Sequence, residues 1–241
     1  MEHEIAIFTA AGPDMLFAWM HFLTGIAWVG MLYYFNLVQV PFMAEAPAET
    51  KPGVVRLLLP RALWWFRWGA VGTLLSGLLL LAYKIHLAGS MAIMKTSWGV
   101  GISLGALLGI VMFLNVWLVI WPKQKIVIAS ANAVAGGGQA DPAAAGAAAR
   151  AFLMSRTNFL FSIPMLFFMG NHRITFFSGE PKMSIGGPLA ICTALIILFE
   201  VIGLMGTKGA GPAKMLDKVV AVIHIGLVLA LFFYFTLDCM L

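Results

Sequence analysis

The sequence has little charge and almost no cysteine, and both shortages restrict what the chain can be. Charged residues make up 10% of the 241 residues, whereas hydrophobic residues make up 61%, a composition outside the range of soluble domains. Cys192 and Cys239 are the only cysteines, and they suggest neither a disulfide framework nor a Cys-x-x-Cys site. A phosphate-binding loop, a nucleophile triad, paired acid/base carboxylates and zinc-ligand spacing are also missing. These absences disfavour the common soluble enzyme classes.

Long hydrophobic runs are what the sequence has instead. A transmembrane helix needs about 20 apolar residues, and six runs reach that length, near residues 15–38, 68–88, 98–121, 158–177, 185–205 and 218–237. The flank of the first run is acidic, so we expect this run to stay as a helix and not to be a cleaved signal peptide. We predict an all-α polytopic membrane bundle of about six helices, forming a single integral membrane domain over residues 1–241.

The connections between the runs predict an orientation. The longest, residues 122–157, is rich in glycine and alanine, which favours a flexible cytoplasmic loop with a short interfacial helix. One side of the membrane receives eleven of the fifteen cations: Lys51, Arg56, Arg61, Arg67, Lys123, Lys125, Arg150, Arg156, Lys208, Lys214 and Lys218. The other side receives four: Lys84, Lys95, Arg173 and Lys182. Cytoplasmic loops carry the excess of cations, so we predict a protein of the bacterial inner membrane with both termini periplasmic.

The net charge of +5 is therefore a topology signal. It could also favour contact with anionic membrane lipid at the inner surface. The cations form no patch of the kind that binds nucleic acid.

His21 is the residue in these runs that points most directly to a function. An ionisable side chain in a membrane span is costly without a partner, so it is a functional-site hypothesis by default. Gly25 shares its helix face one turn later and leaves a gap beside the imidazole. Trp28 could form a wall of that gap. The motif predicts a haem site, and a histidine that only hydrogen-bonds a neighbouring helix is an equal alternative.

Other histidines could complete such a site. If the fourth helix runs to residue 177, His172 lies at a depth similar to that of His21, about 10 Å at 1.5 Å per residue, and the two rings could hold one haem iron. His86 is a third candidate ligand, or an interfacial histidine that reaches lipid headgroups. Arg173 could pair with a haem propionate, because guanidinium pairs well with carboxylates.

Glu200 and His224 suggest a second buried site. They enter from the predicted cytoplasmic side at comparable depth, so they could pair and reduce the cost of each other's burial. The pair could relay protons or bind a quinone, or it could be a buried hydrogen bond that fixes helix packing. A different signal comes from the small residues Gly101, Gly105 and Gly109, which recur every fourth residue. They predict either a tight contact within the chain or an oligomer contact.

Several of these residues belong to unusual motifs that occur in order along the chain. They are Trp19-x-His21, Gly25-Ile-Ala-Trp28-x-Gly30, Trp65-Phe66-Arg67-Trp68, Arg156-x-Asn158, Pro164-x-Leu166-Phe167-x-Met169 and Asn171-His172. With them the chain resembles the PuuD-type urate oxidase N-terminal family over most of its length. Members are bacterial inner-membrane proteins linked to urate oxidation, often fused to a C-terminal periplasmic cytochrome c domain. The sequence has no Cys-x-x-Cys-His, so we expect that cytochrome domain to be lacking here.

The resemblance implies a role in electron handling, with His21 and His172 at matching motif positions. We therefore expect an integral membrane protein that binds haem b non-covalently. It would pass electrons to or from a periplasmic cytochrome c or a larger membrane complex. The first alternative is a urate-oxidising membrane enzyme, a urate hydroxylase-like oxidoreductase. The second is a cofactor-free structural subunit of a larger respiratory or photosynthetic complex.

Overall fold

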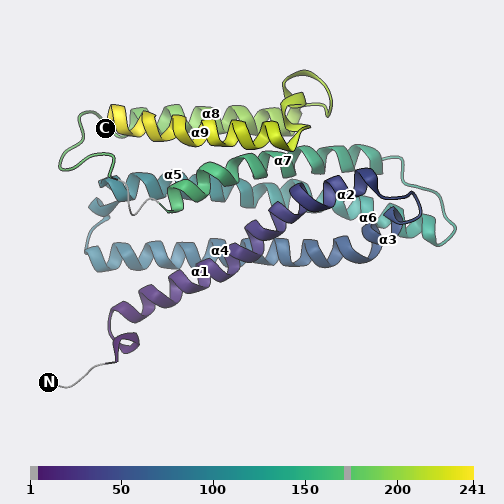
Figure 1. Ribbon diagram of the computed structural model, residues 1–241. Coiled ribbons are helices and arrows are strands. Elements are labelled where there is room, and N and C mark those ends of the chain that lie inside the picture. Colours follow the sequence, from purple (N-terminus) through teal and green to yellow (C-terminus); the bar gives the residue numbers. More distant parts are fainter. Residues whose placement is uncertain (1–4, 171–174) are drawn as a thin grey trace.

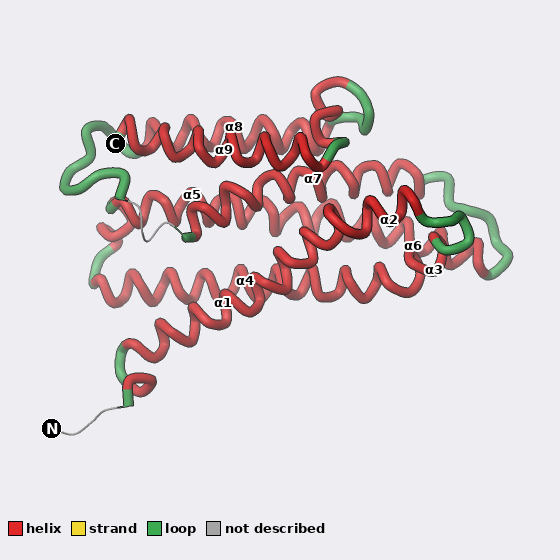
Figure 2. The backbone as a smooth tube through the Cα atoms, in the orientation of Figure 1, coloured by secondary structure: helices red, strands yellow, loops and turns green. Residues whose placement is uncertain are grey.

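The computed structural model describes residues 5–170 and 175–241, and it shows an elongated bundle of helices (Figure 1). Within these residues the regular structure is helical, without a strand (Figure 2). Six continuous helices are long and apolar enough to cross a membrane: Ala11–Glu45, Lys51–Ala88, Ser97–Ala135, Ala144–Met169, Gly186–Met205 and Val219–Met240. The chain is thus an all-helical, multi-pass membrane protein, as its composition predicts.

Each of the first three spans consists of two α-helical parts joined by a π-helical stretch. The first span is α1 (Ala11–Tyr33) and α2 (Val40–Glu45), the second is α3 (Lys51–Gly53) and α4 (Leu59–Ala88), and the third is α5 (Ser97–Leu114) and α6 (Trp121–Ala135). The other spans are α7 (Ala144–Met169), α8 (Gly186–Met205) and α9 (Val219–Met240).

Proline accounts for the three π-helical stretches, Tyr34–Gln39, Val54–Leu58 and Asn115–Ile120. Pro41, Pro60 and Pro122 each lie two residues beyond the end of one of them. A proline inside a helix has no N–H to donate, and its ring collides with the carbonyl four residues earlier. A wider turn at that point relieves the collision, so each helix continues through its proline.

The helix α1 lies across α4 at very close range (Figure 1). Glycines of α4 make this possible, because a Cβ on Gly69 would lie 2.9 Å from the backbone nitrogen of Trp28. A Cβ on Gly77 would likewise lie 2.9 Å from the His21 ring. Small residues at such crossings let two backbones approach each other. The result is that His21 is fixed against one particular helix.

The centre of the bundle is α7, which packs against α5, α6, α8 and α9. Its most apolar window is 67% buried, compared with 11% for the first span. Gly105 and Gly109 face α7: a Cβ on Gly105 would lie 3.3 Å from Cβ of Phe168, and one on Gly109 would lie 3.6 Å from Sδ of Met165. Gly101 is also buried. Gly105 and Gly109 therefore serve a contact within the chain, against α7.

Several expected boundaries differ from the structure. The second span, expected from residue 68, begins at Lys51, and the third, expected to end at residue 121, continues to Ala135. The fourth span was expected over residues 158–177, but α7 begins at Ala144 and ends at Met169. The connection expected over 122–157 is mostly helical, since only residues 136–143 separate α6 from α7. Alanine has the highest helix propensity, so the alanine-rich stretch extends α7 backwards, and Gly170 follows its end.

Both ends of the described chain lie at the same end of the bundle (Figure 1). We call this the terminal end, and we call the other end, which holds the 136–143 connection, the opposite end. The prediction that the terminal end is periplasmic concerns orientation in a membrane and stays a prediction.

Candidate functional site

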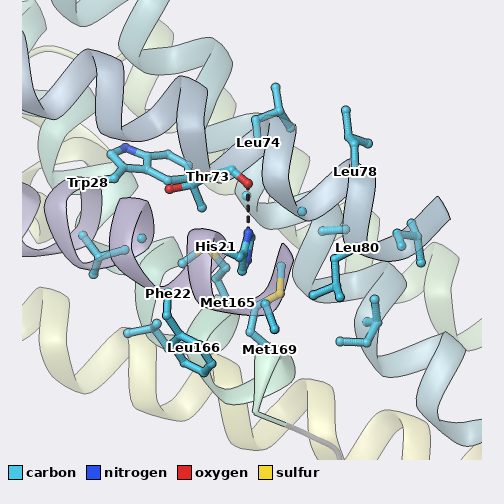
Figure 3. A pocket seen from close by; sticks show the side chains of 18 of the residues that line it. His21, Phe22, Trp28, Thr73, Leu74, Leu78, Leu80, Met165, Leu166 and Met169 are labelled. Atoms are coloured by element: carbon cyan, nitrogen blue, oxygen red, sulfur yellow. Dashed lines mark hydrogen bonds between the residues drawn. The ribbon is translucent and has the colours of Figure 1, made fainter. Parts of the chain in front are cut away.

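A cavity of about 810 Å³ opens between α1, α4, α5 and α7 (Figure 3). Its lining residues lie mostly in the half of each span nearer the terminal end. On α1 its lining residues run from Ala18 to Tyr33, and on α4 from Thr73 to Lys84. The volume lies within the range of roughly 300–1,000 Å³ that is usual for small-molecule and cofactor sites. Most of the wall is apolar, with polar atoms from only a few side chains.

His21 is the polar side chain at the centre of this cavity wall (Figure 3). Its Nδ1 lies 2.9 Å from the carbonyl oxygen of Thr73 and 3.3 Å from Oγ of Ser76 on α4. A carbonyl only accepts, so Nδ1 carries the hydrogen and donates it, and Nε2 of the neutral ring keeps its lone pair. Metal-binding histidines are oriented in this way, with the second ring nitrogen donating to a carbonyl or carboxylate.

Glycines leave open space in the cavity wall. A Cβ on Gly25 would meet only the Thr73 methyl group, at 3.9 Å, and a Cβ on Gly30 would meet nothing within 4 Å. Both residues line the cavity, as does Gly77, against which the His21 ring lies. The structure thus places Gly25 in the cavity wall beside His21, where the sequence suggested a gap.

Aromatic and sulfur-containing side chains join aliphatic ones in the rest of the wall. Trp28 lines the cavity and is 2% exposed. Met165 and Met169 contribute from α7 (Figure 3). Tyr33 lies at the end of the α1 lining that is farthest from the terminal end, and its hydroxyl lies 3.3 Å from Oγ of Ser162.

Lys84 is a lining residue that the sequence analysis missed. Its Nζ donates to Oδ2 of Asp14 at 2.8 Å, which ties α4 to α1 near the terminal end. Asp14 precedes His21 by seven residues, and Lys84 follows Gly77 by seven. The Asp14–Lys84 contact and the His21–Gly77 contact are therefore seven residues apart on both antiparallel helices. Matched heptad spacing on the first two runs is the signal that could have revealed the ion pair.

The other candidate ligands lie elsewhere or outside the description. His86 is exposed near the end of α4 and does not line the cavity; its ring lies 6.2 Å from that of Tyr83. His172 and Arg173 fall outside the described residues. Their assignment as iron ligand and propionate partner stays a prediction.

Glu200 and His224 each have a different partner. Oε2 of Glu200 accepts a hydrogen bond of 2.9 Å from Nδ2 of Asn115. The exposed His224 bonds through Nδ1 to the Val220 carbonyl of its own helix, at 2.7 Å. No hydrogen bond or ion pair between Glu200 and His224 occurs in the described structure. The predicted pair is therefore not formed, because His224 faces away from the bundle.

The partner of Glu200 belongs to a buried network. Nδ2 of Asn115 also donates to Oδ1 of Asn158, at 2.9 Å, and Nδ2 of Asn158 donates to the Met112 carbonyl, at 2.9 Å. Asn158 is 0% exposed. The network joins the third, fourth and fifth spans. Across residues 5–170 and 175–241, no group of three or more His, Cys, Asp or Glu side chains gathers as a metal site would require.

Comparisons with known proteins relate the chain to a protein family. A family described as urate oxidase N-terminal matches residues 91–231, which is more than half of the chain. The matched region contains α5 to α8 and part of α9, whereas His21 and Thr73 precede it. No curated protein matched. No solved structure matched either.

Proposed function

Because the chain belongs to the urate oxidase N-terminal family, we propose that it binds haem b in the cavity without a covalent bond and transfers electrons within the membrane. The family relates the chain to membrane redox chemistry in general terms. The observation that carries the finer proposal is His21, whose Nδ1 is held by the Thr73 carbonyl at 2.9 Å while Nε2 is left to bind iron.

The shape of the cavity supports a flat, apolar cofactor. The open glycine Gly25 provides smooth wall near the His21 ring, and Gly30 does so farther along α1. The surrounding side chains are mostly aliphatic, aromatic and methionine, which suits a macrocycle better than a polar substrate. Among residues 5–170 and 175–241, Lys84 is a cation that lines the cavity. Its ammonium group could face a haem propionate at the terminal end.

Haem held by two histidines would supply one-electron chemistry. His172 is the second ligand that the sequence predicts. Within the described structure, His21 would hold the iron, Thr73 and Ser76 would fix the ring orientation, and the apolar wall would exclude water.

Urate oxidation is the second candidate, and the family name favours it. Urate is a small purine with polar groups around its whole edge. A site for it needs many hydrogen-bond partners, because each unpaired buried polar group is costly. The cavity supplies few, chiefly from His21, Tyr33, Thr73 and Lys84, which supports haem over urate as its ligand.

A periplasmic cytochrome c is the partner we propose, in a bacterial inner membrane with the terminal end outward. The cavity lies in the half of the bundle nearer that end, so the electron path to such a partner would be short. A reporter that is active only in the cytoplasm should give signal when inserted at residues 136–143 and none when fused after Leu241. The reverse pattern would refute both the orientation and the partner.

The absorption spectrum of the purified chain tests the cofactor. We expect a Soret band with the features of low-spin haem. His21→Ala should abolish the band or convert it to a high-spin form, since one ligand is removed. His172→Ala tests the second ligand in the same way.

His86→Ala and His224→Ala are the matched controls, because both histidines are exposed and lie outside the cavity wall. Their spectra should equal that of the unmodified chain. A chain without a Soret band favours the cofactor-free structural subunit, and a urate-dependent activity without haem favours the second candidate. A full low-spin complement in the His21 variant would refute the ligand assignment.

A further inference from the structure

The network around Glu200 lies between the cavity and the opposite end, and the proposed function does not use it. Glu200 is five residues from the last residue of α8, which is about 8 Å at 1.5 Å per residue. It accepts from Asn115, and Asn115 also donates to Asn158. The network thus begins close to the opposite end and leads into the centre of the bundle.

From Asn158 the polar groups continue along α7 toward the cavity. Ser162 lies one turn further on the same helix face, and both residues are 0% exposed. Their Cβ atoms are about 5–6 Å apart by this spacing, so one water could bridge their polar groups with two hydrogen bonds. The Ser162 hydroxyl lies 3.3 Å from that of Tyr33, which lines the cavity.

We propose that Glu200, Asn115, Asn158, Ser162 and Tyr33 form a proton route between the opposite end of the bundle and the cavity. The carboxyl group and the two hydroxyls carry the proton, waters alongside Asn115 and Asn158 would carry it over the stretch between Glu200 and Ser162, and the two amides hold those waters in place. One proton enters at the Glu200 carboxylate and one leaves at the Tyr33 oxygen. Only O–H bonds form and break, and no oxidant or reductant is needed.

The surroundings of Glu200 favour this role over an ion pair. In the described chain no cation forms an ion pair with it, since the pair recorded there is Lys84 with Asp14. A carboxylate in an apolar setting without a cation is expensive, and binding a proton removes the charge. Ionisable groups inside membrane spans mark functional sites, and proton relays are one class of these.

The purpose of this proton route rests on the proposed function, which is electron transfer through the cavity. An electron that enters a cavity of low dielectric adds a charge, and a proton that arrives by the route compensates it. The polar chain ends at the cavity residue Tyr33, where that compensation would act.

Proton uptake during reduction tests the route, with an indicator dye as the readout and the Soret band as a check that haem is retained. We expect the unmodified chain to take up protons on reduction. Glu200→Gln, which still accepts from Asn115, should lose most of the uptake, and so should Tyr33→Phe. His224→Gln and Asn36→Leu are controls outside the route and should retain it. Equal uptake in Glu200→Gln and the unmodified chain would overturn the proposal.

A second measurement does not depend on haem. Dicyclohexylcarbodiimide adds to a protonated carboxyl group within the membrane: the proton moves to one nitrogen, the oxygen adds to the central carbon, and no group leaves. We expect a mass shift on the peptide that contains Glu200, absent in Glu200→Gln. An unlabelled Glu200 would contradict the route whether or not haem is present. A labelled Glu200 in a chain without a Soret band would refute the haem proposal alone.

Discussion

His21 and His224 have the same side chain in different surroundings: His21 lies between two helices, and His224 is exposed on one. Each lies in a membrane span, and each bonds through Nδ1 to a backbone carbonyl, at 2.9 Å and 2.7 Å. The His21 bond crosses to α4, and its ring faces a cavity. The His224 bond stays on its own helix, and its ring is exposed.

The difference shows what converts a polar residue in a membrane span into a site. A bond within one helix satisfies a ring without placing it against anything else. A bond between helices fixes the ring relative to a second wall, here through the close approach at Gly77. The comparison therefore depends on α4 as much as on His21.

The largest effect is expected from removing that close approach. In Gly77→Val the new Cβ would lie 2.9 Å from Cε1 and 3.1 Å from Nδ1 of His21, so the ring must leave its position. We expect loss of the Soret band almost as complete as in His21→Ala, and a fall in unfolding free energy of about 1–3 kcal/mol from overpacking. Gly146→Val, at an exposed helical glycine with open space around it, should leave the spectrum unchanged.

Filling the cavity should have the next largest effect. Gly25→Leu has room, because a Cβ there meets only the Thr73 methyl group at 3.9 Å. The fold should therefore be retained or slightly stabilised, since leucine exceeds glycine in helix propensity by roughly 0.5–1 kcal/mol. Haem content per chain should fall several-fold while His21 stays in place. An undiminished content would show that the cofactor does not occupy this space.

Ser76→Ala should weaken the site only modestly. The change removes the 3.3 Å contact between Oγ and Nδ1 of His21 but leaves the shorter bond to the Thr73 carbonyl. One hydrogen bond contributes about 0.5–1.5 kcal/mol, so haem affinity should fall about 2- to 10-fold. Titration of the apo form with haem would measure this. A complete loss of binding would mean that Ser76, and not Thr73, orients the ring.

The smallest effect is expected from His224→Leu, which completes the comparison. The ring is exposed, and its bond is internal to α9. The midpoint of thermal unfolding should be almost unchanged, because surface substitutions usually alter stability by less than about 0.5 kcal/mol. Haem content should match that of the unmodified chain. A spectral change would give His224 a role that its position does not explain.

The sequence predicted the helical class and most spans because membrane insertion depends on local hydropathy. The fourth span was predicted too far along the chain. Arg150 and Arg156 lower the local hydropathy, so the predicted span begins after them, although α7 continues through both. Arg156 is 2% exposed, so burial among other helices, and not contact with lipid, decides its place. Local composition carries no information about that burial.

Part of the candidate site was also predictable. His21 and Gly25 stand out because a histidine and a glycine share one face of an apolar helix. Thr73 takes part through its carbonyl, a group that every residue has, so side-chain chemistry gave no signal. The partner of Glu200 was predicted wrongly because comparable depth does not specify which way a side chain faces around its helix.

The position of the cavity's opening determines how a ligand reaches it. Phe22, Ile26 and Leu78 line the cavity, yet they are 71%, 69% and 50% exposed, so the opening lies on the flank of the bundle that faces lipid. An apolar ligand gains about 0.8 kcal/mol for each CH₂ group that leaves water, and it accumulates in the bilayer before it meets the protein. The supply to the cavity is then set by partition into the membrane and by diffusion within its plane, and not by the ligand's direct encounter with the protein from water.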